Sequence, residues 1–247
     1  MKILITGGTG YIGSHTVVEL QQKGYTVIII DNLSNSTKDV IYSVEKITGI
    51  LPEFHKIDLC DENLTKKFFS KNKDIKGVIH FAAYKAVGES MEQPLKYYHN
   101  NLFSLINLLT CMNEQSINNL VFSSSCTVYG QPDILPVKED APFKKALSPY
   151  GHTKQICEDI IVLAAKKHGL KAISLRYFNP IGAHESALIG ELPIGVPDNL
   201  IPYITQTAIG KRDCLRVFGN DYNTTDGTCI RDYIHVVDIA KAPCNSS

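Results

Sequence analysis

Short apolar runs alternate with longer helical stretches from the first residues of the chain as far as Arg176. Short apolar runs rich in β-branched side chains are typical of buried strands. We predict strands over Lys2–Thr6, Thr26–Ile30, Glu53–Ile57, Gly77–Phe81, Asn119–Ser123 and Lys171–Arg176. We predict helices over Tyr11–Lys23, Lys38–Thr48, Glu62–Ser70, Leu95–Gln115 and Pro149–His168.

Near-continuous apolar strands separated by helices favour a parallel sheet that is covered on both faces. Because crossovers between parallel strands are right-handed, these elements predict a doubly wound α/β fold of the Rossmann type. Proteins with this fold bind their ligands at the carboxyl ends of the strands.

The pattern changes after Arg176. The residues Asn179–Asn199 are rich in glycine and proline and are predicted to be mostly loop. A short helix over Leu200–Ile209 and a strand around Leu215–Phe218 follow, and the polar stretch Gly219–Thr228 predicts further turns.

This change divides the chain into two predicted parts. We expect residues 1–178 to form the nucleotide-binding domain and residues 179–247 to form an incomplete, smaller substrate domain. Within the second part, residues 232–241 are expected to return to the first domain.

Composition narrows the function classes. The 247 residues carry a formal net charge of zero, so we expect neither nucleic acid nor a membrane as a partner. The N-terminus lacks the pattern of a signal peptide, and dispersed cysteines then indicate reduced thiols in a cytoplasmic protein. The spacing of histidines and cysteines suggests no zinc site, so no metal is expected. The cysteines are residues 60, 111, 126, 157, 214, 229 and 244.

A glycine triplet follows the first predicted strand and opens the first predicted helix. Gly7, Gly10 and Gly13 let a backbone approach phosphates closely, and the helix start directs amide groups and a positive dipole at a pyrophosphate. An ordinary strand–helix turn would also tolerate these glycines. Their place at the start of the alternating pattern favours a dinucleotide site.

Two acids follow later strands. Asp31 ends the second strand, where an acid accepts hydrogen bonds from the adenosine ribose. No arginine or lysine nearby would neutralise a 2′-phosphate, so NAD is favoured over NADP. Asp58 follows the third strand, either as an adenine contact or as the N-cap of the next helix.

Tyr150 and Lys154 lie four residues apart and share one face of a predicted helix. Tyrosine has an ordinary pKa near 10, and a tyrosine that acts as a base near neutrality needs a pKa roughly 3 units lower. A neighbouring ammonium group and an oxidised nicotinamide ring both favour the phenolate. The alternative is a half-buried tyrosine beside a solvated lysine on an amphipathic helix.

Three serines end the fifth predicted strand at the same edge of the sheet. Ser123, Ser124 and Ser125 are placed where one hydroxyl can bind a substrate oxygen while Tyr150 takes its proton. The alternative, in which a serine merely caps a loop, is expected for Ser123 or Ser124.

Sequence motifs now identify a family. The chain resembles the UDP-glucose 4-epimerase family of extended short-chain dehydrogenases/reductases over nearly all its length, to about Lys241. The matching stretches are TGGTGYIGSH, DNLSNS, HFAAYKAVGES, FSSSCTVYG, SPYGHTK, LRYFNPIGAH, NLIPYITQTAIG and VFGNDYNTTDGTCIRDYIHVVDIA. The Tyr-x-x-x-Lys and glycine motifs mark the superfamily, whereas the KAVGES, RYFNP and RDYIHV stretches are specific to epimerases and close sugar-nucleotide relatives.

The resemblance implies a reaction. Bound NAD takes a hydride from C4 of UDP-glucose or UDP-galactose while Tyr150 takes the hydroxyl proton, and both return to the other face of the sugar. Ser125 hydrogen-bonds the reacting oxygen, and Lys154 holds the nicotinamide ribose and lowers the pKa of Tyr150.

The resemblance also implies two sets of binding residues. The NAD site adds to the three glycines the residues Tyr11, Ile12, Asp31, Asn32, Leu33, Ser34, Asn35, Ser36, Asp58, Leu59, Phe81, Ala82, Ala83, Tyr84, Lys85, Asn100, Ser125, Tyr150, Lys154 and Phe178. The UDP-sugar contacts are Lys85, Ser125, Tyr150, Asn179, Asn199, Leu200, Val217, Phe218 and Arg231, with Val217 and Phe218 beside the uracil and Arg231 on the diphosphate.

The family continues beyond Lys241, whereas this chain reads Ala242–Ser247. We therefore expect a C-terminally truncated member that lacks part of the nucleotide-sugar pocket. A proline soon after Val237 argues against a helix there. Apolar residues such as Ile201, Ile204 and Ile234 are expected to be left uncovered.

Two alternatives stay open. One is a truncated NAD-binding variant with little or no epimerase activity. The other is a nucleotide-sugar dehydratase or decarboxylase, although Ser123–Thr127 offers no acid/base carboxylate pair of the kind that dehydratases need. Relatives pair through two helices, here Leu95–Gln115 and Pro149–His168, so a homodimer is a further hypothesis.

Overall fold

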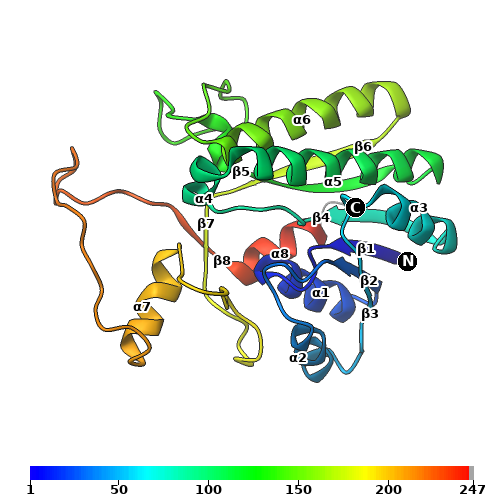
Figure 1. Ribbon diagram of the computed structural model, residues 1–247, viewed down its shortest axis with the longest axis horizontal. Coiled ribbons are helices and arrows are strands. Elements are labelled where there is room, and N and C mark those ends of the chain that lie inside the picture. The colour runs from blue at the N-terminus through cyan, green and yellow to red at the C-terminus, as the bar shows by residue number, and fades with distance from the viewer. Residues whose placement is uncertain (245–247) are drawn as a thin grey trace.

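The computed structural model of the chain describes residues 1–244, so the last three residues of the second predicted part lie outside it. Six strands form one sheet: β1 (Lys2–Thr6), β2 (Thr26–Asp31), β3 (Glu53–Lys56), β4 (Ile75–His80), β5 (Asn119–Ser125) and β6 (Lys171–Tyr177). All neighbouring strands are parallel, in the order β3-β2-β1-β4-β5-β6 (Figure 1). The predicted doubly wound sheet is confirmed, and its strand order reverses between β1 and β4.

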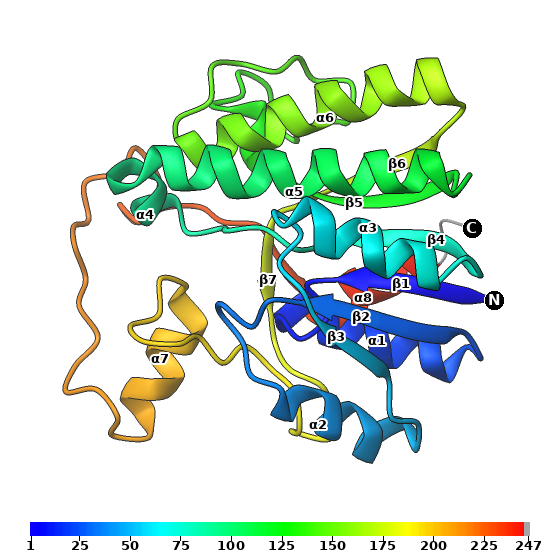
Figure 2. The ribbon, with the colours of Figure 1, turned by 45° about the vertical axis from the view of Figure 1, so that its right-hand side comes forward.

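Helices cover both faces of the sheet (Figure 2). Their bounds are α1 (Tyr11–Gln22), α2 (Asp39–Thr48), α3 (Glu62–Lys71), α4 (Val87–Glu92), α5 (Pro94–Glu114), α6 (Pro149–His168), α7 (Leu200–Ala208) and α8 (Val236–Cys244). One face carries α3, α5 and α6, and the other carries α1, α2 and α8. The short helix α4 and the 3-10 turn η1 (Cys126–Tyr129) were not predicted.

The alternation of side chains along the central strands explains the two layers. Leu4 and Ile28 belong to the core beneath α3, α5 and α6, whereas Ile5 and Ile29 belong to the core beneath α1 and α2. All four are fully buried. Since successive side chains of a strand point to opposite faces, an unbroken apolar strand requires cover on both sides.

Local signals fix the ends of α6, the helix that carries the Tyr150–Lys154 motif. The Ser148 hydroxyl accepts a hydrogen bond from the Gly151 amide at 3.1 Å, and Pro149 occupies the first turn. Gly169 ends the helix with φ at +67°, a left-handed conformation that glycine adopts without strain. The predicted bounds of α6 are therefore confirmed at both ends.

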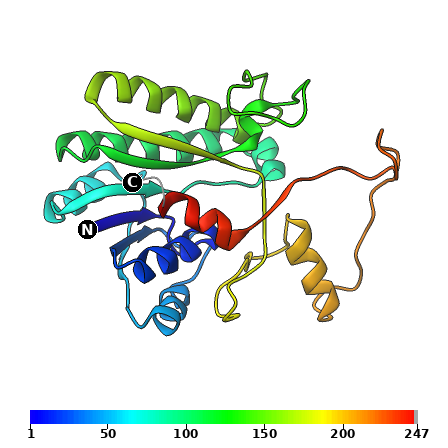
Figure 3. The same cartoon turned by 180° about the vertical axis from the view of Figure 1, so that it is seen from behind.

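The second part of the chain agrees with its prediction except for one strand: residues 182–199 are mostly irregular, and the helix expected over Leu200–Ile209 is α7. Short strands β7 (Asn179–Ile181) and β8 (Tyr233–His235) pair in parallel, and α7 lies apart from the main sheet (Figure 3). The strand expected over Leu215–Phe218 is wrong, because these residues are irregular, and Phe218 is 96% exposed with no neighbouring strand to pair with. Ile204 and Ile234 are exposed, as expected.

The prediction that a proline soon after Val237 argues against a helix there is wrong, because α8 includes Pro243. The helix continues to Cys244 with Pro243 inside it, although proline lacks the amide hydrogen that a helix interior uses. Val236, Ile239 and Ala240 are fully buried on the side of α8 that packs against α1. Burial of this face offsets the lost hydrogen bond, which falls in the last turn.

Among residues 1–244, none of the helices combines the length and the apolar character needed to cross a bilayer.

The packing of α8 on α1 generates a stability prediction. Ile239→Ala leaves a cavity beneath α8 and should lower the free energy of unfolding by about 2–4 kcal/mol. Lys241→Ala, on the exposed side of the same helix, should change it by less than about 0.5 kcal/mol. Urea denaturation measures both, and equal effects of the two substitutions would contradict this packing.

Candidate active site

The glycine turn lies at the carboxyl end of β1 and is closely packed. Gly7 has φ at +71°, and its amide donates to the Ile30 carbonyl at 2.8 Å. A Cβ on Gly7 would lie 2.7 Å from the Ala82 nitrogen, and one on Gly13 would lie 2.2 Å from the Gly7 carbonyl oxygen. Gly10 precedes α1 with no side-chain cap, so the first amides of α1 face the turn without a capping side chain. This cradle suits a phosphate group.

Asp31 ties the glycine turn to the loop after β2. It is 9% exposed, and its two carboxylate oxygens accept hydrogen bonds from the Thr9 amide at 3.2 Å and the Leu33 amide at 2.9 Å. The Thr9 and Ser36 hydroxyls lie 2.6 Å apart. Leu33 has φ at +61°, a strained conformation for a leucine, which this loop imposes.

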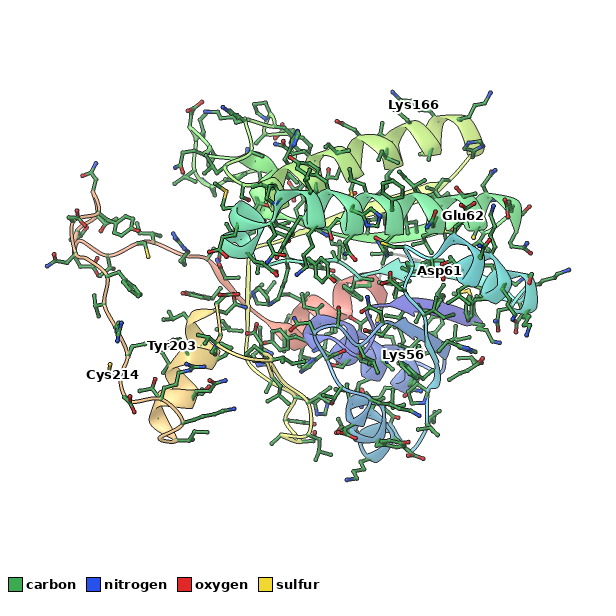
Figure 4. The ribbon with its side chains drawn as sticks, in the orientation of Figure 1. Lys56, Asp61, Glu62, Lys166, Tyr203 and Cys214 are labelled. Atoms are coloured by element: carbon green, nitrogen blue, oxygen red, sulfur yellow. The ribbon has the colours of Figure 1, made fainter. Side chains whose placement is uncertain are left out.

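Asp58 lies beside the same loop. Its carboxylate accepts hydrogen bonds from the Asn32 side-chain amide at 3.2 Å and from the Cys60 backbone amide at 2.9 Å. The N-cap of α3 is Asp61, whose carboxylate accepts a hydrogen bond from the Leu64 amide at 2.9 Å. The alternative in which Asp58 is the N-cap of α3 is therefore wrong. Figure 4 labels Asp61 at the start of this helix.

Tyr150 and Lys154 lie on the buried face of α6, next to the carboxyl end of β5. Tyr150 is 9% exposed and Lys154 is 4% exposed. The Lys154 ammonium donates to the Ser123 carbonyl at 2.7 Å and lies 4.8 Å from the centre of the Phe122 ring. The solvated lysine of the alternative interpretation is therefore excluded.

Burial controls the charge states of this pair. Burial raises the pKa of Tyr150 to about 12, while its interaction with Ser125 acts in the opposite direction. Burial lowers the pKa of Lys154 to about 8, and the neighbouring Cys157 and Glu158 side chains act against that shift. In the chain alone, desolvation disfavours the Tyr150 phenolate more than the hydrogen bond with Ser125 favours it. The expected lowering of the Tyr150 pKa therefore requires further positive charge beside the phenol and stays a prediction.

The three serines take three different roles. The Ser125 hydroxyl accepts hydrogen bonds from the Thr127 amide at 3.2 Å and the Thr127 hydroxyl at 2.9 Å. The Ser124 hydroxyl donates to Glu158, and Ser123 offers its carbonyl to Lys154. The serine that caps the following turn is therefore Ser125, and not Ser123 or Ser124.

A buried amide joins the loop after β4 to α6. The Asn101 side chain accepts a hydrogen bond from the Tyr84 amide at 2.9 Å and donates to the Tyr84 carbonyl and the Thr153 hydroxyl, each at 3.1 Å. Thr153 in turn donates to the Tyr150 carbonyl at 2.7 Å. The Asn100 side chain donates to Asn101 at 3.0 Å, so this network places the predicted residues Tyr84 and Asn100 beside α6.

Lys85 and Asn199 come together through an acid that the sequence did not suggest. The Lys85 ammonium lies 3.2 Å from Glu191 Oε1, and the Asn199 side chain donates to the same oxygen. Tyr11 is nearby, because the Glu191 charge contributes, after burial, to raising its pKa. The Tyr11 hydroxyl donates to the Gly182 carbonyl at 2.6 Å, which links α1 to the segment after β7.

The residues that the resemblance assigns to the UDP-sugar in the second part of the chain lie on several separate segments. The Asn179 side chain donates to the Asp232 carbonyl at 2.7 Å, and Arg231 lies close enough to Cys126 to lower its pKa against the larger effect of burial. Val217 and Phe218 are 81% and 96% exposed on the segment after α7. That segment extends away from the sheet, as the label for Cys214 shows in Figure 4. The described contacts do not bring Val217 and Phe218 to Tyr150.

Sequence reasoning missed several buried polar groups around the site. His80 lies 2.7 Å from the Thr6 hydroxyl and has a pKa lowered to about 3 by burial, so it is neutral. Asn101 and Glu191 act through contacts distant in the sequence, which leave no local signal. Glu158 had a signal, because it continues the spacing of Tyr150 and Lys154 by one further turn.

The donor set fits a dinucleotide. The cradle at Gly13 and the uncapped start of α1 offer amides that suit a pyrophosphate, and the buried carboxylate of Asp31 offers acceptors that suit a ribose. With the Tyr150–Lys154 pair on α6, these features define a Rossmann-type protein of the short-chain dehydrogenase/reductase class.

The chain belongs to the NAD dependent epimerase/dehydratase family, whose model matches residues 3–244. It is 55% identical over 241 residues to the UDP-glucose 4-epimerase of Dictyostelium discoideum, covering 97% of this chain and 70% of that protein. It is 51% identical to the UDP-glucose 4-epimerase of Bacillus subtilis over 98% of this chain and 71% of that protein.

A solved structure is also similar over nearly the whole chain. The crystal structure of the UDP-glucose 4-epimerase from Bifidobacterium longum, in complex with NAD+ and UDP, matches with a TM-score of 0.94 and 46% identity over 98% of this chain and 72% of that chain. The family resemblance predicted from the motifs is therefore confirmed.

The tight contact at Gly13 generates a prediction. Gly13→Ala forces the first turn of α1 away from Gly7 and should lower the free energy of unfolding by about 1–3 kcal/mol. Gly88→Ala is the matched control, since a Cβ there meets nothing within 4 Å and the residue lies in α4. Thermal or urea denaturation compares them, and an equally stable Gly13→Ala variant would refute the close packing.

Proposed function

We propose that the chain interconverts UDP-glucose and UDP-galactose by transient oxidation at C4, with bound NAD and with Tyr150 as the base. The observation that carries the proposal is the Tyr150–Lys154 pair, buried beside Ser125 at the edge of the sheet where the glycine turn also ends. Relatives and solved structures with the name UDP-glucose 4-epimerase favour this reaction over a dehydratase or a decarboxylase.

The cofactor half of the site consists of the glycine turn, Asp31 and the loops after β2 and β4. The turn and the start of α1 would hold the pyrophosphate, and Asp31 would accept hydrogen bonds from the adenosine ribose. When bound, oxidised NAD supplies a hydride acceptor and a positive charge that favours the phenolate form of Tyr150.

The chain's own groups move the proton. The Tyr150 phenolate accepts the proton of the sugar 4-hydroxyl and later returns it, while the Ser125 hydroxyl orients the reacting oxygen. Lys154 contributes a buried cation on the same helix face, one turn from Tyr150. Because burial raises the pKa of Tyr150 to about 12, positive charge near the phenol is essential for base catalysis at neutral pH.

The substrate half joins both parts of the chain. Lys85, from the loop after β4, and Asn199, at the start of α7, share the Glu191 carboxylate, while Asn179 begins β7. We infer that these side chains contact the sugar and that Arg231 binds the diphosphate through its forked donors. The roles of Leu200, Val217 and Phe218, the division at residue 178 and the cytoplasmic location stay predictions.

Substitution of Tyr150 tests the reaction. Tyr150→Phe removes the proton acceptor and should lower the rate of UDP-galactose conversion by about 10²–10⁴-fold. The content of bound NAD, measured in the same sample, should be unchanged. Tyr42→Phe, an exposed tyrosine on α2, is the control, and conversion by Tyr150→Phe at the control rate would overturn the proposal.

We also propose a homodimer through α5 and α6. Phe103 and Ile106 on α5 and Val162 and Leu163 on α6 are each at least 43% exposed, although they are large and apolar. A groove of about 240 Å³ between the two helices is lined by further apolar side chains, among them Leu109, Ile160 and Ala164. An exposed apolar face of this kind is typical of a protein interface.

Light scattering tests the dimer. The wild-type chain should have the mass of two copies, and Leu163→Glu should shift the mass towards one copy because it places a charge in the interface. Tyr42→Glu adds the same charge to an exposed residue of α2 on the opposite side of the sheet and should leave the mass unchanged. A wild-type mass of one copy would contradict this proposal.

A further inference from the structure

One face of α6 contacts the end of β5 at successive turns. Tyr150, Lys154 and Glu158 follow each other at intervals of four residues and therefore share this face. The Lys154 ammonium donates to the Ser123 carbonyl at 2.7 Å, and the Ser124 hydroxyl donates to Glu158 at 2.5 Å. The proposed reaction uses the first two side chains of this face but assigns no role to the third.

Glu158 is a buried carboxylate held by a guanidinium. It is 6% exposed, and Arg176 on β6 donates to both of its oxygens, at 3.1 and 2.8 Å. Arg176 also donates to the Tyr129 hydroxyl and the Glu139 carbonyl, both at 2.9 Å, and lies 4.8 Å from the centre of the Phe143 ring. The pair therefore connects α6, β5, β6 and the loop after η1.

The charge of Glu158 bears on the buried ammonium one turn away. Desolvation disfavours the charged form of a lysine, and an opposite charge nearby restores it. Arg176 forms a two-bond, charge-assisted pair with the Glu158 carboxylate, at 3.1 and 2.8 Å. The groups that face Lys154 are the Phe122 ring and Ser123 carbonyl of β5, the neutral His80 of β4, and Tyr150, Cys157 and Glu158 of its own helix.

We propose that Glu158, held in place by Arg176, is a positioning residue for the reaction: it aligns α6 with the end of β5 and keeps Lys154 cationic beside Tyr150. This inference rests on the proposed function, because that reaction is what requires a cation at this position.

The direction of the effect follows from the charges. Burial lowers the pKa of Lys154 to about 8, and Cys157 and Glu158 act in the opposite direction. Removing the Glu158 charge lowers this pKa further, so the ammonium is lost at a lower pH. Activity that needs the ammonium then falls at a lower pH on the alkaline side.

Glu158→Gln is the central variant, since it removes the charge and keeps an oxygen that can accept from Ser124. The alkaline limb of the kcat profile should move towards lower pH by about one unit. The pH titration of the Lys154 ε-carbon, followed by NMR in selectively labelled protein, should shift in the same direction and needs no turnover. Asp159→Asn removes the same charge from the adjacent, exposed residue and should move neither curve.

Two further variants keep the test decisive. Glu158→Asp retains the charge with a shorter side chain, so it should lower kcat without moving the alkaline limb. If Glu158→Gln does not fold, the double variant Glu158→Gln with Arg176→Met removes both charges and leaves neither partner unpaired. Its Lys154 titration should shift in the same direction but by less, because Glu158 acts on the pKa of Lys154 while the loss of the Arg176 cation opposes part of the change.

The outcomes separate this inference from the proposed function. A Lys154 titration that is unchanged in Glu158→Gln, or shifted equally in Asp159→Asn, would overturn it. Absence of UDP-galactose conversion by the wild-type chain would instead count against the proposed function, and the NMR titration would still decide whether Glu158 sets the charge of Lys154.

Discussion

A lysine ammonium buried against the end of a strand is the constraint on which this site depends. Lys154 gives up hydration and receives one backbone carbonyl and the face of an aromatic ring in return. Such an arrangement holds only where α6 and β5 are fixed to each other within a fraction of an ångström, because a lost contact would leave a charge in apolar surroundings. The hydrogen bond from Ser124 on β5 to Glu158 on α6 therefore matters as much as those of the reacting groups.

The opposite edge of the site is shaped by the absence of side chains. Gly7 and Gly13 allow the turn after β1 to touch Ala82 and itself at distances that no Cβ would permit. Asp31 then fixes that turn to the loop after β2 through two backbone amides. The side of the site at β5 thus depends on the buried charge of Lys154, and the side at β1 depends on glycines without side chains. The neighbouring strands β1, β4 and β5 connect the two sides.

Features that depend on local periodicity were predictable, and features that depend on distant contacts were not. Residues close together in the sequence determine the apolar strands, the caps of α6 and the Tyr150–Lys154 spacing. The main sheet and the Tyr150–Lys154 pair could therefore be predicted from the sequence. Strand β7 exists only because β8 pairs with it from far along the chain. The raised pKa of Tyr150 depends on burial, and the links from Asn101 to Thr153 and from Glu191 to Lys85 depend on partners far away in the sequence.

The pairing of β7 with β8 brings together the two ends of a long segment, residues 182–232. Asn179 and Asp232 meet through two hydrogen bonds, so the two ends of this segment are held together. Its beginning also contacts the main body, because Gly182 accepts a hydrogen bond from Tyr11, Glu191 pairs with Lys85, and Ile189 lies in the core beneath α1 and α2. The entropy of closing a loop grows only with the logarithm of its length. Insertions and deletions after α7, where the chain is exposed and irregular, therefore cost little, and that part can be remodelled while the sheet and α6 stay as they are.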